Sequence, residues 1–326
     1  MGLERIASLE PDTLRIVDAH HHLWDLGQGW YPWLRAGFNE PFFLGETTAL
    51  RRNYLPADYR MDSFGVLVEA SVHVEAECER SLALEETRWL HQQHQSQHLP
   101  HAVVAHAWLH DEQLEEKLDA PARFPLVRGI RSKPRTRVKP DAPELSGPGT
   151  LQDPQWRAGL RTLAARDWSW DLRVLFWHLS EAAQTLEQVP ELRVALNHTG
   201  LPWDRSQEGL RIWRSGMKQL AALPQVVCKL SELGLRDEAW SIDSNRRVVL
   251  EAIEIFGPDR CLFASNYPVA GLRVGFSTQL LAILAMIEDL SPSEQDAILR
   301  ANALRFYRIQ AVQARAEASP VDALAP

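Results

Sequence analysis

The 326-residue sequence has few cysteines, no long apolar run and no excess of basic residues. Its three cysteines, Cys78, Cys228 and Cys261, show no CxxC spacing, so they predict buried thiols in a reducing compartment rather than disulfides or a metal site. No segment reaches the roughly 20 apolar residues that cross a bilayer. The formal net charge of −8 argues against nucleic acid or an anionic membrane as a partner. The N-terminal residues carry charges where a signal peptide is apolar, so we expect a cytoplasmic protein.

A glycine-rich GxGxxG motif after an early strand is also absent, which removes the main argument for an open dinucleotide-binding sheet. The chain instead alternates short runs rich in Val, Ile and Leu with longer amphipathic stretches. The candidate strands are 14–18, 65–72, 102–107, 126–130, 172–176, 192–196, 226–230 and 261–264. Eight strands alternating with helices predict an α/β fold of the closed (β/α)8 type, a TIM barrel.

The expected helices are 79–94, 154–166, 180–188, 207–222, 243–256 and 279–289. Pro292 opens a last helix, for which Ser291 and Glu294 form a capping box. We expect residues 1–312 to form a single catalytic barrel and residues 313–326 to be a frayed tail. Two long connections, 24–59 and 132–153, follow candidate strands and therefore emerge where barrels build active sites. The first is rich in aromatic residues; it either caps a substrate or only buries itself.

The strongest local signal is the segment VDAHHHLWD at the end of the first candidate strand. Strand side chains alternate between two faces, so Asp18, His20 and His22 share the face that points into a barrel. Two imidazoles at the barrel mouth can hold one metal ion, with Asp18 orienting one of them. The competing interpretation is that one or two of these histidines only pack or make hydrogen bonds.

Histidines also end three other candidate strands. His73 ends the second strand, with Glu75 two residues later on the same face, while His178 and His198 end the fifth and sixth. Each of them alone fits a core or rim histidine. Together they indicate one shared site, because chance would scatter histidines over both ends of the barrel.

Five segments stand in this order: VDAHHHLWD, VRGIR, LNHTGLP, VVCKLSELG and FGPDRCLFASNYPV. The set, which spans about residues 14–310, resembles the lactonase-containing branch of the amidohydrolase superfamily, including L-fuconolactonase-like and 2-pyrone-4,6-dicarboxylate lactonase-like enzymes. The resemblance implies that His20, His22 and His198 lie at the active site. It also implies His178 as a fourth candidate metal ligand, because many members use a fifth-strand histidine.

One position departs from the family pattern. The usual eighth-strand segment is Ser-Asp-Trp-Pro, and here Asn266 stands in place of the aspartate. An amide is not a useful general base, so Glu75, His178 or His198 would have to activate the water. The missing anion also lowers the expected metal affinity. One divalent ion, with zinc as the first choice, and metal-free operation both stay open.

Cationic side chains complete the expected site. Arg131 matches the second arginine of the family's Arg-Gly-Ile-Arg pattern and is the preferred partner of a substrate carboxylate, whereas Arg128 is equally explained by a salt bridge between strands. Lys229 is expected to stabilise a developing oxyanion, or else to form a buried ion pair with Glu232 or Asp18. Further substrate contacts are expected from His73, Trp24 and Tyr267.

The leading hypothesis is therefore hydrolysis of a small lactone derived from a sugar acid or an aromatic breakdown product. A histidine-bound ion, or His20, His22 and Lys229 directly, would polarise the carbonyl. The substrate is expected to be small and anionic or hydroxylated, and a homo-oligomer is compatible with the sequence. Two alternatives stay open: a decarboxylase or lactone isomerase, which can avoid activating a water, and a catalytically impaired barrel that binds a small molecule.

Overall fold

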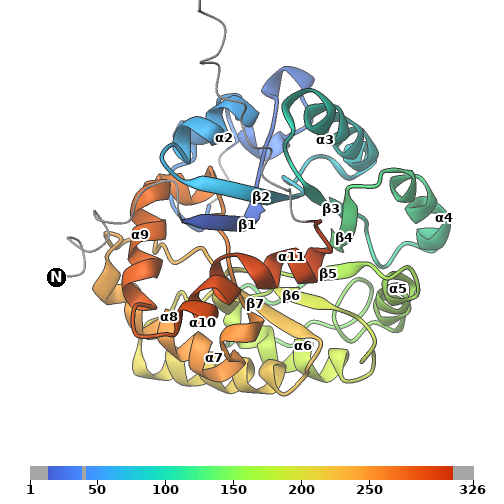
Figure 1. Cartoon of the computed structure of the whole chain (residues 1–326). Coiled ribbons are helices and arrows are strands. Elements are labelled where there is room, and N and C mark those ends of the chain that lie inside the picture. The colour runs from blue at the N-terminus through green and yellow to red at the C-terminus, as the bar shows by residue number, and fades with distance from the viewer. Residues whose placement is uncertain (1–13, 39–41, 311–326) are drawn as a thin grey trace, which may run out of the picture.

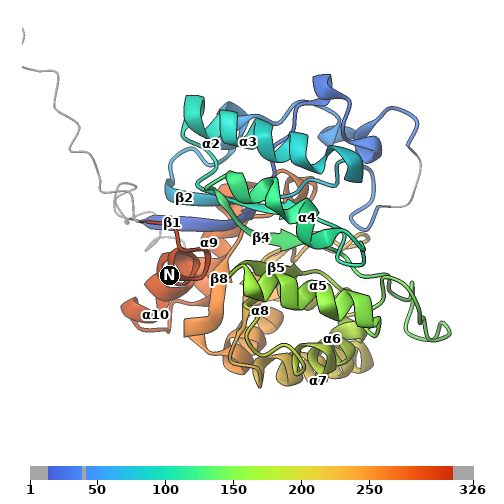
Figure 2. The same cartoon turned by 90° about the vertical axis from the view of Figure 1, so that its right-hand side faces the viewer.

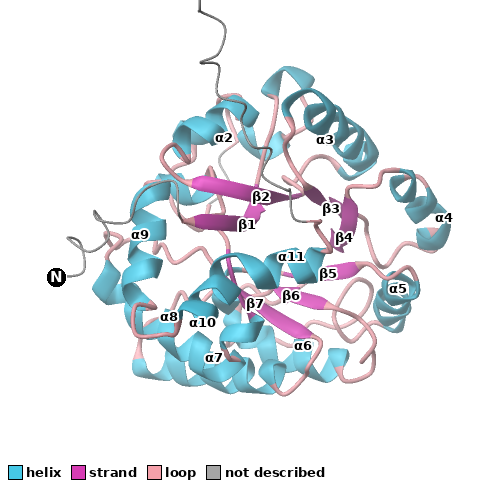
Figure 3. Cartoon of the chain, in the orientation of Figure 1, coloured by secondary structure: helices cyan, strands magenta, loops and turns pink. Residues whose placement is uncertain are grey.

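The structure, a computed structural model, describes residues 14–38 and 42–310. Within these ranges eight parallel strands form one sheet in the order β1 to β8. The strands are β1 Arg15–His21, β2 Leu67–Val74, β3 Ala102–His106, β4 Val127–Arg131, β5 Ser169–Leu172, β6 Val194–Leu196, β7 Val226–Leu230 and β8 Cys261–Phe263. Figures 1 and 3 show the strands in the centre with the helices around them, so the predicted (β/α)8 barrel is confirmed.

The barrel closes where the ends of β1 and β8 meet. The backbone N–H of Asn266 donates to the carbonyl of His20 at 2.7 Å, and that of His22 donates to the carbonyl of Tyr267 at 2.7 Å. Asp18 supports this seam, because its carboxylate accepts hydrogen bonds from Ser265 and from the Tyr59 hydroxyl. Asp18 therefore orders the two strands, and it does not orient an imidazole as the sequence suggested.

The helices are α2 Pro56–Asp62, α3 Ala83–Gln97, α4 Leu114–Asp119, α5 Pro154–Ala165, α6 Leu179–Leu186, α7 Gln207–Ala221, α8 Ile242–Phe256, α9 Phe276–Met286, α10 Pro292–Asp296 and α11 Asn302–Tyr307. The apolar stripe of α7, with Leu210, Trp213 and Met217 at helical spacing, is buried against the barrel. The predicted capping box of α10 is present, because Ser291 and Glu294 exchange side-chain and backbone hydrogen bonds. No helix in the described ranges combines the length and apolar character needed to cross a membrane.

The two ends of the barrel differ. Helix α11 lies across one end (Figure 1), where the buried Tyr307 hydroxyl donates to Asp171 at 3.0 Å. The connections that follow β1 and β4 extend from the opposite end, to the right in Figure 2. The strands point toward this open end, so any side chain that follows a strand terminus is presented there.

The predicted fifth strand, 172–176, is wrong: β5 is Ser169–Leu172. The predicted range left out Asp171, whose carboxylate is buried in the fold and paired with Lys229. The chain consequently leaves the sheet at Arg173, and His178 lies in a short 3-10 helix, Phe176–His178. The other seven predicted strands overlap those observed. The three cysteines are buried free thiols, and the predicted tail 313–326 lies outside the described residues.

Candidate active site

A cavity of about 620 Å3 lies at the open end of the barrel. Three kinds of side chain line it. The polar group comprises His22, His198 and Asn266; the cations include Arg131, Lys133 and Arg173; the aromatic group comprises Trp33, Phe38, Phe42, Phe43 and Trp203. The aromatic rings of the first long connection also stack on one another and on Trp203, so this connection both packs on itself and lines the cavity.

The histidines of β1 and β6 converge beside this cavity. The ring centroids of His20 and His198 are 4.6 Å apart, and those of His20 and His22 are 5.0 Å apart. The middle histidine of the motif, His21, instead hydrogen-bonds Ser71 at 3.0 Å and packs on Tyr59. The structure thus brings together the three imidazoles that the sequence placed at one site, although they belong to strands distant in the chain.

The backbone at the mouth adopts left-handed conformations at several non-glycine residues, among them three that belong to the histidine cluster and its hydrogen-bonded neighbours. The φ angles are +60° at His198, +50° at Glu232 and +55° at Asn266. Such conformations cost about 1–3 kcal/mol each and persist where the surroundings enforce them, often at functional sites. Here they turn the side chains that follow β6, β7 and β8 toward one another.

His22, Asn266 and Glu232 form a buried hydrogen-bonded chain. The Nδ1 atom of His22 lies 2.7 Å from the Val74 carbonyl, so this nitrogen must donate, and Nε2 lies 3.2 Å from Oδ1 of Asn266. The Asn266 amide nitrogen donates to the Glu232 carboxylate. Both ring nitrogens of His22 therefore face oxygen acceptors, an arrangement that suits a ring carrying two protons.

Burial determines the protonation states of His22 and Glu232 in this hydrogen-bonded chain when no substrate is bound. It lowers the pKa of His22 to about 3, so the ring is neutral at rest. It raises the pKa of Glu232 to about 7, against the opposing effects of the Asn266 hydrogen bond and of Arg173. The other carboxylate oxygen of Glu232, Oε1, is buried without a hydrogen-bond partner in the described part of the chain. Glu232 is therefore a carboxyl group that titrates near neutral pH beside the histidine cluster.

His20 lies beside a cation, and it contacts His22 and His198, two histidines that line the cavity. The Nδ1 atom of His20 is 3.5 Å from Nζ of Lys229, while its buried Nε2 has no partner among the described residues. Lys229 has only donors, so Nδ1 accepts and Nε2 carries the ring proton. Lys229 itself pairs with Asp171, not with Glu232 or Asp18 as the sequence suggested. Burial first, and then the charge of Lys229, lower the pKa of His20 well below its ordinary value.

Glu75 and Arg131 neutralise each other. Nε of Arg131 donates to Oε1 of Glu75 at 2.6 Å, and both side chains are almost fully buried. Burial, the largest single effect, raises the pKa of Glu75, but Arg131, His106 and Lys133 together outweigh it and lower the pKa to about 2. The second oxygen of Glu75 accepts from the backbone N–H of Glu77 at 2.8 Å, so both carboxylate oxygens are occupied and Glu75 serves as the counter-ion of Arg131.

The structure does not bring Arg128 or His178 to the cavity. Arg128 donates to the carbonyls of Pro125 and Val127, near the start of β4 and away from the mouth. The two ring nitrogens of His178 are occupied by the Glu181 carboxylate at 2.7 Å and by the Arg137 backbone N–H at 3.0 Å. His178 lies outside the site because β5 ends earlier than the hydropathy pattern indicated.

The three expected aromatic contacts lie behind the cavity lining. Trp24 donates its indole N–H to the Arg52 carbonyl at 2.7 Å, and the Tyr267 hydroxyl donates to the Val274 carbonyl at 2.7 Å. Nδ1 of His73 accepts from the backbone N–H of Leu23 at 3.1 Å. These three groups have structural partners, whereas Nε2 of His73 is buried without one among the described residues. None of the three side chains lines the cavity.

The residues that sequence reasoning did not place in the site include Asp171, Arg173, Lys133 and Glu232. Arg173 and Lys133 each follow a strand within two residues, a signal that would have found both once β5 was placed correctly. Glu232 was expected only as a partner for Lys229. Nothing in the sequence alone indicated that the turn after β7 would direct it at Asn266.

The donor set of the histidine cluster does not fit a divalent cation. Within residues 14–38 and 42–310, no three His, Cys, Asp or Glu side chains come together as a metal site. Asn266 supplies no charge, and Lys229 and Arg131 add positive potential that lowers the pKa of His20 after burial itself. A field that repels a proton from an imidazole also repels a dication.

The sequence and fold of this chain were compared with those of known proteins. The model of the amidohydrolase family matches residues 17–309. The chain belongs to the amidohydrolase family. As the sequence predicted, it is a hydrolase of the lactonase-containing branch, since most of the chain also matches two proteins named L-fucono-1,5-lactonase.

Three relatives show the extent of this similarity. The uncharacterized protein y4mH of Sinorhizobium fredii is 34% identical over 298 residues, which cover 91% of this chain and 99% of that protein. L-fucono-1,5-lactonase of Burkholderia multivorans is 28% identical over 306 residues, covering 90% and 96%. A solved amidohydrolase from B. multivorans with bound zinc aligns with a TM-score of 0.75 and 26% identity, over 90% and 99% of the two chains.

Proposed function

We propose that this amidohydrolase opens a small lactone by attack of water on the ring ester. The observation that carries the proposal is the convergence of His20, His22 and His198 beside Asn266 at one cavity. The match to lactonases over about nine-tenths of the chain supports the same class of reaction. The cavity volume of about 620 Å3 is large enough for a small ring compound.

The carbonyl oxygen of the lactone is polarised by His20. Nε2 of this ring carries a proton and has no partner in the described part of the chain, so it is free to donate to an oxygen that becomes negative. Lys229, at Nδ1 of the ring, strengthens the donor because its positive charge stabilises the imidazole as Nε2–H shares its proton with the oxyanion. The buried position excludes water, which increases the strength of this contact.

His22 takes the proton of the attacking water. Its Nδ1 proton is held by the Val74 carbonyl, so Nε2 has the lone pair. Once protonated, Nε2–H donates to Oδ1 of Asn266, and the Glu232 carboxylate, bound through the same amide, supplies the opposite charge. Glu232 is thus a positioning residue that stabilises the imidazolium through Asn266.

The reaction balances without another reactant. The water oxygen forms a bond to the carbonyl carbon, its proton passes to His22, and the ring C–O bond breaks. The alkoxide that leaves takes the proton from His22, which gives a hydroxy acid. No step passes through a metal ion, and we propose metal-independent turnover because Lys229 and Arg131 add positive potential at the histidines and Asn266 takes the place of an anionic ligand.

The test is turnover of a lactone panel followed by base consumption in a pH-stat, with and without a chelator, alongside elemental analysis of the purified protein. Ring opening that survives the chelator is the expected result. Incubation in heavy-oxygen water adds label to the product of hydrolysis but not to that of decarboxylation or isomerisation. Failure on every lactone, with a clean rate on a decarboxylation or amide substrate, overturns the proposal; tight binding without turnover indicates an impaired barrel.

A further inference from the structure

Arg173 differs from Arg131 and Lys133, two other cations of the cavity. Arg131 is bound to Glu75, and Lys133 forms an ion pair with Glu77. Arg173 makes no ion pair or hydrogen bond with any residue in 14–38 or 42–310, although it lines the cavity. Its guanidinium carbon lies 5.4 Å from the centroid of the Phe43 ring.

The positive charge of Arg173 is poorly compensated in the protein alone. Burial first and Arg131 second lower the pKa of Arg173 to about 10, although Glu232 and Glu75, which form no ion pair with it, act in the opposite direction. Arg173 therefore stays charged at neutral pH, but at a cost. Arg173 in turn is the largest charge effect, after burial, that lowers the pKa of His198. An anion beside Arg173 would relieve both effects, because it would compensate a charge that is otherwise partly desolvated.

The position of Arg173 relates this charge to the proposed reaction. It follows β5 directly, and His198 comes two residues after the neighbouring strand β6. Adjacent strands lie about 4.8 Å apart, so an anionic group on Arg173 and a ring ester at the histidines fit one small molecule. Phe43 holds the guanidinium through a cation–π contact, leaving its edge for two parallel hydrogen bonds.

We propose that Arg173 binds a carboxylate on the substrate, and that the enzyme therefore acts on acidic lactones in preference to neutral sugar lactones. This inference rests on the proposed lactonase function. It moves the carboxylate contact from Arg131, which the sequence favoured and which Glu75 occupies, to Arg173. The chain as a whole is acidic, with a net charge of −8, so this local cation is a specific feature of the cavity.

The experiment compares two matched probes: the lactone of 2-hydroxyglutaric acid, which keeps one free carboxylate, and its carboxamide. Wild type is expected to prefer the acid in kcat/KM, and Arg173→Gln to lose about 10- to 100-fold on the acid alone, mainly through KM. Arg173→Lys keeps the charge without the planar fork and is expected to be intermediate. Arg214→Gln removes an arginine from the outer surface and is the control, with unchanged rates.

A binding measurement distinguishes a failure of this inference from a failure of the proposed lactonase function. Calorimetric titration with 2-hydroxyglutarate, the ring-opened dianion, is expected to give weaker binding to Arg173→Gln than to wild type or Arg214→Gln. If no lactone is opened but this difference is measured, the lactonase proposal fails and the anion site stands. Equal rates on acid and carboxamide in the wild type, or equal or absent dianion binding in wild type and Arg173→Gln, overturn the inference.

Discussion

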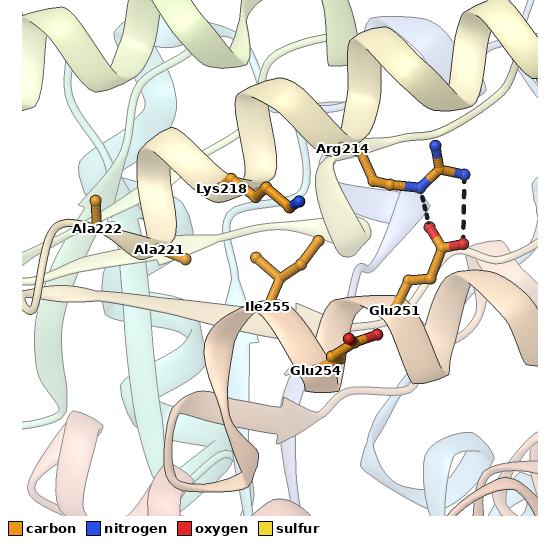
Figure 4. Close-up of a pocket in the computed structure, with 7 residues that line it drawn as sticks. All are labelled: Arg214, Lys218, Ala221, Ala222, Glu251, Glu254 and Ile255. Carbon is orange, nitrogen blue, oxygen red and sulfur yellow. Dashed lines mark hydrogen bonds and ion pairs between the residues drawn. The ribbon is translucent and has the colours of Figure 1, made fainter.

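Two hollows of similar size in this molecule differ in how their charges are balanced. The groove between α7 and α8 has a volume of about 480 Å3, and Figure 4 shows Arg214 in it facing Glu251. Two contacts join this pair, one of them at 3.3 Å, and Arg247 adds a third cationic contact to Glu251 at 2.8 Å. At the barrel mouth Arg173 has no such partner among the described residues. The difference teaches that unbalanced charge, and not volume, distinguishes a ligand site from a structural groove.

The largest effect is expected from Glu232→Gln, which removes the carboxylate proposed to stabilise the protonated His22. We expect kcat to fall by about 10²–10⁴, the range of general acid–base catalysis. In the wild type Glu232 must be ionised, so activity should rise with pH through about 7, the raised pKa of this group. The variant should lose this limb of the pH–rate profile, and Glu232→Asp should restore part of it.

Glu251→Gln in the groove is the matched control, because it removes a carboxylate of balanced charge and should leave kcat unchanged.

Asn266→Asp tests the central residue of the hydrogen-bonded chain formed by His22, Asn266 and Glu232. It would set a second carboxylate against Glu232, and two adjacent carboxyl groups resist joint ionisation. We expect lower activity than in wild type. A rise in activity with Asn266→Asp, or a pH limb unchanged in Glu232→Gln, would contradict the role given to Glu232.

The next effect is on stability, at the closed end of the barrel. Asp171 binds Lys229, Tyr307 and Asn197 in a fully buried network. Asp171→Asn leaves Lys229 buried without a counter-charge and is expected to lower the free energy of unfolding by about 3–5 kcal/mol. Urea unfolding followed by tryptophan fluorescence measures this change.

The double variant Asp171→Leu with Lys229→Met serves as the control, since replacing both charges by apolar groups is often neutral or stabilising. It should recover most of the lost stability while activity stays low, because Lys229 also contacts His20. If the single and double variants are equally unstable, the unpaired charge of Lys229 is not the cause of the lost stability, and the prediction is contradicted.

The smallest effect is expected where charge is balanced at the surface. Arg214→Gln should change the free energy of unfolding by at most about 1 kcal/mol, as is usual for partly exposed ion pairs. Its kcat and KM should equal those of wild type. A change in turnover comparable with that of Arg173→Gln would show that the groove takes part in function, and the comparison between the two hollows would fail.

Much of the architecture was readable from the sequence because it depends on local periodicity. Strand side chains alternate, so the HHH motif alone places His20 and His22 on one face. The parallel order of the strands then requires His198 to lie at the same end of the barrel. The boundary of β5 was not readable, because a buried aspartate is acceptable only when a cation from a distant strand meets it.

The sequence by itself determined the barrel, its functional end and the family to which the chain belongs, since these follow from repeating patterns and contiguous motifs. Only the tertiary structure decided which charges are balanced. Arg131 and Arg173 are alike as residue types, but one meets Glu75 and the other meets the cavity. Glu232 likewise reaches Asn266 only because the turns after β7 and β8 face each other. Pairing depends on the positions of groups from separate strands, and local sequence does not encode those distances.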